Sequence, residues 1–166
     1  MNELIAILRK SKADDFLIRQ TNTVSQEVFF IGQKLDMGRA KDVTHTMVTV
    51  YVDSEDKQFR GSASKEIHPT STPEEIKKEI DAAIFAASFV KNPWFPVVED
   101  ETCEDAGLDV DLTAELVKIT KAMQAVKSLE NESVNSYEIF ANKKQTRIVN
   151  SKGVEVTMSN FECEVE

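Results

Sequence analysis

The clearest alternation of apolar and polar residues lies in the first third of the chain. From Met47 to Val52 a valine occupies every second position, and this period of two is typical of a half-buried β-strand. The charged stretch Asp53–Lys57 then predicts a turn, because none of its side chains suits a core. Gln58–Ser64 is therefore expected to return beside the first strand as the second half of a hairpin.

A helix is predicted to follow this hairpin. In the stretch Thr72–Glu75, a threonine suited to capping precedes a proline and then two glutamates, which is a helix-start pattern. Apolar residues then recur at helical spacing, and Phe85 and Phe89 are expected to widen the apolar face. Asn92–Pro93 is expected to stop the helix, because proline disfavours helical geometry in the residue before it.

The segments before this unit predict one helix and several short strands. Glu3–Ala13 has an apolar stripe opposite basic residues, as in an amphipathic helix. Phe16–Ile18 and Glu27–Gly32 each predict a short strand, separated by the polar residues Thr21–Thr23. Gln33–Met37 is expected to extend the second of these strands toward the long one.

An apolar patch and an acidic stretch follow the predicted helix. Trp94, in the patch Trp94–Val98, is expected to fold back on the core, and an exposed anchor for a partner is the alternative. The acidic residues between Glu99 and Asp105 suggest an internal boundary, so that 1–98 and 108–166 would be two related halves.

The pattern of apolar residues in the last third of the chain predicts one helix and three strands. Asp109 or Asp111 is expected to cap a helix whose apolar residues continue to Val126. From Ser136 onward the period is two again, with polar turns expected at Asn142–Lys144 and Ser151–Gly153. The predicted fold class is thus α+β, with antiparallel β-sheets and helices packed on them.

Composition narrows the classes of function. The 166 residues carry 20 basic and 29 acidic side chains, a net charge of −9, which disfavours direct binding to nucleic acid or to anionic membranes. No apolar run is long enough to span a bilayer, and the N-terminus does not look like a secretory signal. We therefore expect a cytoplasmic protein, in which Cys103 and Cys163 are free thiols.

No pattern of catalytic residues is visible. The five glycines stand apart, so a phosphate-binding loop is not supported. His45 and His68 lack a second histidine at ligand spacing, and Ser62 and Ser64 lack a nearby His/Asp pattern. Catalytic, cofactor-binding and metal-binding residues are accordingly all expected to be absent from this chain.

Two segments carry a family resemblance. The stretch Phe59–Ser64, followed by a Pro-Glu-Glu helix, resembles the Lys/Arg-Gly-Ser-Ala-Ser hairpin and helix of the TldD/PmbA family, whose members are named as candidate modulators of DNA gyrase. Tyr137–Ala141 and then Thr146–Val154 are similar to that family's Thr-Arg-Ile-Val-Asn-Ser-x-Gly hairpin, more on the PmbA side.

The resemblance implies part of a zinc metallopeptidase that acts on peptides or unfolded protein. In that family a His-Glu-x-x-x-His helix lies downstream of the second hairpin; its two histidines hold zinc and its glutamate can activate water. This sequence contains no such motif. Residues 1–166 would then be an N-terminal domain that is inactive alone, with zinc and the catalytic domain expected downstream. The implied partners are that catalytic domain, a peptide substrate, and a second subunit in a homodimer or a TldD–PmbA-type heterodimer.

The residues that carry the resemblance are the candidate contacts for a substrate or a subunit interface: Arg60, Gly61, Ser62, Arg147, Asn150, Ser151 and Gly153. Each also has a purely structural explanation. Gly61 and Gly153 could supply turn or bulge geometry, Asn150 and Ser151 could bond their own backbone, and Arg147 could pair with Glu155 across the hairpin. A stand-alone module that binds a peptide by strand addition, without enzymatic activity, is the alternative function.

Overall fold

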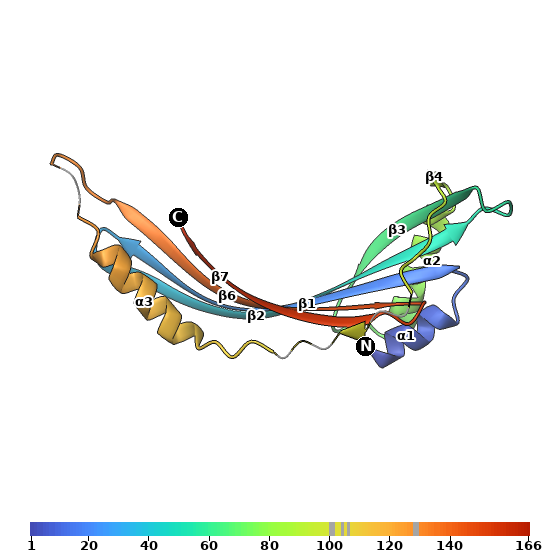
Figure 1. The fold of residues 1–166 in the computed structure, drawn as a ribbon, viewed down its shortest axis with the longest axis horizontal. Coiled ribbons are helices and arrows are strands. Elements are labelled where there is room, and N and C mark those ends of the chain that lie inside the picture. Colours follow the sequence, from blue (N-terminus) through green and yellow to red (C-terminus); the bar gives the residue numbers. More distant parts are fainter. Residues whose placement is uncertain (100–101, 104, 106, 128–129) are drawn as a thin grey trace. The chain divides into compact units, whose positions relative to one another are not determined.

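The computed structural model describes residues 1–99, 102–103, 105, 107–127 and 130–166. These residues form three helices and seven strands in an α+β arrangement (Figure 1). In chain order the elements are α1 (Asn2–Arg9), β1 (Asp15–Ile31), β2 (Lys34–Asp53), β3 (Phe59–Ile67), α2 (Pro73–Ala87), β4 (Asn92–Pro93), β5 (Thr102–Cys103), α3 (Leu112–Gln124), β6 (Ser136–Asn150) and β7 (Glu155–Val165). None of the helices built from the described residues has the length and apolar character needed to cross a bilayer.

The strands form one mixed sheet in the order β4-β3-β2-β1-β6-β7-β5. The predicted hairpin is confirmed: β2 and β3 are antiparallel, with Val50 opposite Ala63 and Asp53 opposite Arg60. The short strand β4 continues this antiparallel pattern beside β3. By contrast, β5 runs parallel to β7, so the sheet is mixed. The predicted α+β fold class is confirmed.

Three strands, β1, β2 and β6, are longer than the sequence predicted. The two short strands expected in 16–32 are the single strand β1, and the turn expected at Asn142–Lys144 lies inside β6. Strand β2 already begins at Lys34, so Gln33–Met37 does not extend β1 as expected. The predicted three-stranded meander is therefore a two-stranded one. Polar side chains persist inside these strands because they find polar partners there: Thr21 Oγ1 lies 3.3 Å from Thr146 Oγ1, and Lys144 forms an ion pair with Glu162.

The described chain forms two compact units, each built from three separate segments. Unit 1 contains Met1–Thr21, Thr44–Asp105 and Thr146–Met158, and unit 2 contains Asn22–Val43, Ala106–Gln145 and Ser159–Glu166. Strands β1, β2, β6 and β7 each contribute residues to both units. The units thus do not coincide with the suggested halves 1–98 and 108–166, and a relation between those halves stays a prediction.

The core of unit 1 lies between the sheet and the helices α1 and α2. Its fully buried side chains include Leu8, Ile18, Val48, Val50 and Ile80. The predicted start of α2 is confirmed as a capping box, in which Thr72 Oγ1 accepts from the Glu75 amide and the Glu75 carboxylate accepts from the Thr72 amide.

The second half of α2 differs from the prediction. The helix ends at Ala87, five residues before Asn92, because Asn92–Pro93 pairs as β4 with Phe59 and Arg60. Phe85 and Phe89 were expected to widen the buried face, but they are 67% and 71% exposed. Their rings pack against each other in an edge-to-face contact, with centroids 4.9 Å apart.

The core of unit 2 lies between the sheet and α3. Asp111 caps α3 by accepting from the amides of Thr113 and Ala114, which confirms one of the two predicted caps. Leu112 and Leu116 are buried, whereas Val126, also expected on the apolar face, is 53% exposed and lies beyond the end of the helix.

A buried carboxylate also stabilises unit 2. Glu27 is 3% exposed and lies between Arg39 and Lys41, with its Oε1 2.7 Å from Lys41 Nζ. Burial opposes ionisation of Glu27 most strongly, but hydrogen bonds from Lys41 and Arg39 outweigh it and lower the pKa of the carboxyl group below its ordinary value.

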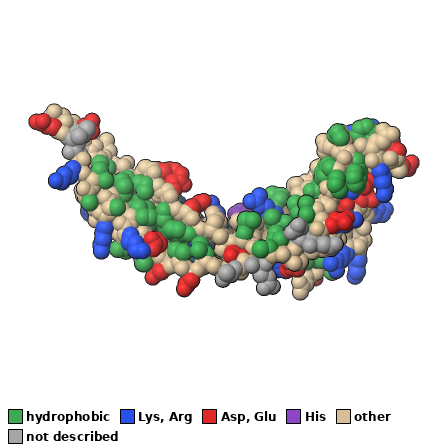
Figure 2. Space-filling model, viewed as in Figure 1, with side chains coloured by type: hydrophobic (Ala, Val, Ile, Leu, Met, Phe, Trp, Pro, Cys, Tyr) green, Lys and Arg blue, Asp and Glu red, His purple; other side chains and the backbone are tan. Residues whose placement is uncertain are grey.

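Large apolar side chains are not confined to the two cores. On the face drawn in Figure 2, hydrophobic side chains reach the surface among acidic and basic ones. Cys103 and Cys163 are both exposed free thiols, as expected.

Replacing Tyr137 with phenylalanine is expected to raise the free energy of unfolding by about 1 kcal/mol. The ring is 4% exposed and stacks on Phe30 at 4.6 Å, yet its hydroxyl is buried without a hydrogen-bond partner among the described residues. Removing an unsatisfied hydroxyl removes a desolvation cost and keeps the stacking. Urea unfolding followed by circular dichroism would measure the change, and a loss of stability would show that the hydroxyl has a partner in solution.

Candidate functional site

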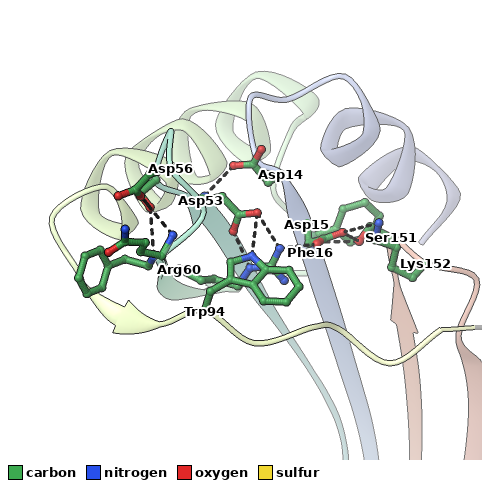
Figure 3. Close-up of polar contacts among 12 residues, drawn as sticks. Asp14, Asp15, Phe16, Asp53, Asp56, Arg60, Trp94, Ser151 and Lys152 are labelled. Carbon is green, nitrogen blue, oxygen red and sulfur yellow. Dashed lines mark hydrogen bonds and ion pairs between the residues drawn. The ribbon is translucent and has the colours of Figure 1, made fainter.

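The side chain of Arg60 is the centre of the most elaborate polar cluster in unit 1 (Figure 3). Arg60 lies on β3 directly opposite Asp53 on β2. Its Nε and Nη2 donate to the two carboxylate oxygens of Asp53 at 2.6 and 2.9 Å, and Nη2 lies 3.0 Å from Asp15 Oδ2 on β1. The guanidinium is 3% exposed. One buried arginine therefore ties three neighbouring strands together.

Aromatic rings surround the same guanidinium. Its central carbon lies 5.0 Å from the ring centre of Trp94 and 5.7 Å from those of Tyr51 and Phe95, distances at which a cation is attracted to the ring face. The Trp94 indole also donates to Asp53 Oδ2 at 3.2 Å. Trp94 does fold back as predicted, although onto Arg60 rather than onto the apolar core, and it stays 40% exposed.

The charges in this cluster stabilise one another. Hydrogen bonds from Arg60 lower the pKa of Asp53, and they outweigh burial, which raises it. The hydrogen bond with Asp53 in turn raises the pKa of Arg60 above its ordinary value. Burial raises the pKa of Tyr51. All of these shifts keep Asp53 and Arg60 ionised and Tyr51 neutral, as a structural ion pair requires.

Asp15 connects this ion pair to the second family-like hairpin. Ser151 Oγ donates to Asp15 Oδ1 at 2.5 Å, and Lys152 Nζ lies 3.8 Å from the same oxygen. Ser151 and Phe16 also exchange hydrogen bonds, from the Phe16 amide to Ser151 Oγ and from the Ser151 amide to the Phe16 carbonyl. We call Asp15, Asp53, Arg60 and Ser151 the Arg60 cluster. Through it, the two hairpins that carry the family resemblance meet in space.

Asn150 holds the turn after β6 through hydrogen bonds to nearby backbone groups, as predicted for this residue. Asn150 Oδ1 accepts from the amides of Lys152 and Val154 at 2.8 and 3.0 Å, and its Nδ2 donates to the Val98 carbonyl at 2.8 Å. Gly153 adopts a φ of 91°, which explains a glycine there. Ser151, by contrast, bonds Asp15 and Phe16 rather than its own neighbours.

The remaining predicted contact residues lie outside the cluster. Arg147 pairs with Glu155 across the hairpin, as its structural explanation predicted. Ser62 is half-buried on β3, opposite Tyr51. Gly61 does not supply a turn: a Cβ atom there would lie 1.9 Å from the Ala87 carbonyl oxygen, so the glycine permits close approach of β3 to the end of α2. Contact of these seven residues with a substrate or partner stays a prediction.

Sequence reasoning missed the two acidic members of the cluster. The charged stretch Asp53–Lys57 predicts a solvated turn, and nothing in the sequence distinguishes Asp15, because a carboxylate beside a short strand is normally exposed. The available signal was the register of the predicted hairpin, which places Asp53 opposite Arg60 once the turn is fixed. Nothing local indicates that Asp15 would join them from β1.

Comparisons with solved structures identify the fold. TldE from Thermococcus kodakarensis superimposes with a TM-score of 0.64 at 15% sequence identity, covering 99% of this chain and 37% of its own. A candidate DNA gyrase modulator from Thermotoga maritima gives 0.61 at 16% identity, with the same two coverages. The chain has the fold of the TldD/PmbA family. The resemblance drawn from the two hairpins is thereby confirmed at the level of fold.

A third match to this TldD/PmbA fold has similar values. A candidate DNA gyrase modulator from Bacteroides thetaiotaomicron gives a TM-score of 0.60 at 14% identity, and the alignment covers 98% of this chain and 38% of that one. The chain thus spans little more than a third of the length of these structures. No family model and no curated protein matches the sequence itself.

The described residues do not fit a zinc site. They bring together no group of three or more His, Cys, Asp or Glu side chains that could hold a metal ion. His45 is instead paired with Glu66 at 2.6 Å on the exposed side of β2 and β3, and His68 bonds Thr70. The zinc implied by the family resemblance has no ligand set in this part of the chain.

Proposed function

We propose that this chain is the non-catalytic part of a TldD/PmbA-like metallopeptidase that acts on peptides or unfolded protein. In this proposal it helps to form the substrate groove or a subunit contact, and zinc and the catalytic residues come from a downstream domain. The observation that supports it is the match over 99% of this chain to about 37% of TldE and related structures. A cytoplasmic location is part of the same proposal.

The Arg60 cluster supports a role as a rigid scaffold in this assembly. A buried arginine with two carboxylate partners holds β1, β2 and β3 in one arrangement, and Ser151 fixes the turn beyond β6 to it. The surface next to it carries the part-exposed rings of Trp94 and Phe95, each 40% exposed, and the ammonium group of Lys152. Aromatic rings on a rigid support are well suited to contact a peptide or a subunit.

The test is a cleavage assay with casein, an unfolded protein, in the presence of zinc. We expect no cleavage by residues 1–166 alone, and cleavage when the chain is joined to, or mixed with, a TldD/PmbA-type portion that carries His-Glu-x-x-x-His. Activity of that portion should rise when the chain is present. Zinc-dependent cleavage by residues 1–166 alone, or activity of the catalytic portion that does not respond to the chain, would contradict the proposal.

The second candidate is a stand-alone module that binds peptides without cleaving them. One observation favours it: among the described residues, β5 pairs with Glu155 and Val156 of β7, which are two of the eleven residues of that strand. The other residues of β7 are candidates for strand addition by a peptide. Binding of casein by residues 1–166, with no effect on any catalytic portion, would favour this candidate.

A further inference from the structure

Two adjoining hollows lie beside α2 in unit 1. The first has a volume of about 260 Å³ and is lined by the end of α1 and by the middle of α2: Ile7, Lys10, Ser11, Lys12, Lys77, Ile80 and Asp81. The second, of about 480 Å³, shares Lys12, Lys77 and Asp81 with it and continues along α2 to Ile84, Phe85 and Ser88. We call the pair the α1–α2 groove. It shares no residue with the Arg60 cluster.

The groove has an apolar floor and wall. Ile80, at its base, is 1% exposed and belongs to the core. Phe85 stands at its far end, is 67% exposed, and packs edge-to-face on Phe89, which is 71% exposed. A phenylalanine pair that leaves most of its surface in water costs solvation free energy in the free protein. An apolar side chain placed in the groove would recover part of that cost.

The rim of the groove is positively charged, in contrast to the chain as a whole. Lys10 and Lys12 are exposed and have no ion-pair partner among the described residues, whereas Lys77 pairs with Asp81 at 2.5 Å. Three ammonium groups and one carboxylate thus surround an apolar hollow, in a protein whose net charge is −9. This local excess of positive charge favours an acidic occupant.

We propose that the α1–α2 groove docks a short acidic segment of a partner protein. Ile80 and Ile84 lie one helical turn apart on α2, about 6 Å along its axis, so the segment would present two large apolar side chains at a similar spacing. One would enter the first hollow, and the other would lie against Ile84 and Phe85. Carboxylates beside them would face Lys10 and Lys12.

The positive rim and the apolar floor together favour an acidic segment with apolar side chains over three other possible occupants of the groove. A basic peptide would be repelled by the rim, and an oligonucleotide would gain from the lysines but would leave the floor in contact with water while meeting the acidic remainder of the chain. A purely apolar peptide would use the floor alone and would not depend on Lys10 or Lys12. Docking of an acidic segment in the α1–α2 groove does not require the proposed peptidase function.

A displayed library of random peptides, about twelve residues long, would test the proposal against the purified chain, with counter-selection on the double variant K10E/K12E. We expect the selected peptides to combine Asp or Glu with Leu, Ile or Phe. One of them, labelled with fluorescein, should bind with an affinity that falls about tenfold in K10E/K12E and severalfold in F85S, and that weakens as salt is raised.

The matched control is K121E/K127E, which makes the same change of net charge on exposed lysines of unit 2. It should leave the affinity unchanged within about twofold. Circular dichroism of each variant would confirm that it folds, since all five side chains are exposed. Selected peptides without an acidic and apolar character, an affinity that K10E/K12E leaves unchanged, equal loss in K121E/K127E, or stronger binding of an oligonucleotide than of the selected peptide would each overturn the proposal.

Discussion

Replacing Arg60 with methionine is expected to lower the free energy of unfolding by about 3–5 kcal/mol. The variant would keep the apolar stem but would leave the carboxylates of Asp15 and Asp53, which are 6% and 11% exposed, without their main counter-ion. Breaking a buried ion pair from one side is costly because the other charges stay desolvated. Urea unfolding at neutral pH, followed by circular dichroism, would measure the loss.

Arg147 provides the matched control. Its ion pair with Glu155 is 35% and 56% exposed, so Arg147→Met is expected to cost at most about 1 kcal/mol. Equal effects of the two variants would show that the Arg60 cluster is not a buried ion network in solution.

The effect of the Arg60 replacement should also depend on pH. The pKa of Asp53 is lowered in the folded state, first by its hydrogen bonds from Arg60. The stability that this pair contributes is therefore fully present above the ordinary Asp value of 3.8 and is lost as the pH falls through the lower folded value. The difference between the wild-type chain and Arg60→Met should accordingly shrink in strong acid, and a difference that grew there would contradict the assignment.

Gly61→Ala is expected to lower the free energy of unfolding by about 3 kcal/mol, although it adds a single methyl group. The new Cβ would lie 1.9 Å from the Ala87 carbonyl oxygen and 2.7 Å from that of Val90. Both are backbone atoms, so no side chain can rotate away, and β3 and the end of α2 would have to separate. Thermal and urea unfolding would measure the loss.

Gly38→Ala serves as the control for this replacement. Gly38 also lies in a strand, but the nearest atom to its Cβ position is the Glu27 carbonyl oxygen at 3.9 Å, and its φ is not positive. There the alanine should be neutral or stabilising, because it reduces the freedom of the unfolded chain. Similar losses at both positions would mean that the close contact at Gly61 relaxes easily.

The sequence predicted those features that depend on neighbouring residues. The capping box at Thr72 and the cap at Asp111 follow from side chains that reach their own helix. The β2–β3 hairpin follows from its alternating valines and its charged turn. Each cap and the hairpin depend only on residues that are close together in the sequence. The local pattern therefore contains the physical cause of these features.

Features set by distant segments were predicted less well. The polar run Thr21–Thr23 predicts a break between strands, yet Thr21 has a hydrogen-bond partner 125 positions away in Thr146. The Arg60 cluster likewise needs Asp15 and Ser151, which are separated by 136 positions. A polar residue indicates a loop only if no distant segment supplies a polar partner for it in the folded chain. The local sequence pattern does not contain that information.

The interleaving of the two compact units affects when each unit can fold during synthesis of the chain. Each unit takes residues from the early, middle and late parts of the sequence, and unit 1 is not complete until Thr146–Met158 has joined it. Between the end of α2 at Ala87 and Met158 a ribosome adds roughly 70 residues, which takes about 4–14 s at synthesis rates of about 5–20 residues per second. During this interval the buried faces of α1, α2 and the β2–β3 hairpin lack β6. Unit 1 therefore cannot finish folding before Thr146–Met158 has been translated, and unit 2 cannot do so before Ser159–Glu166 has been translated.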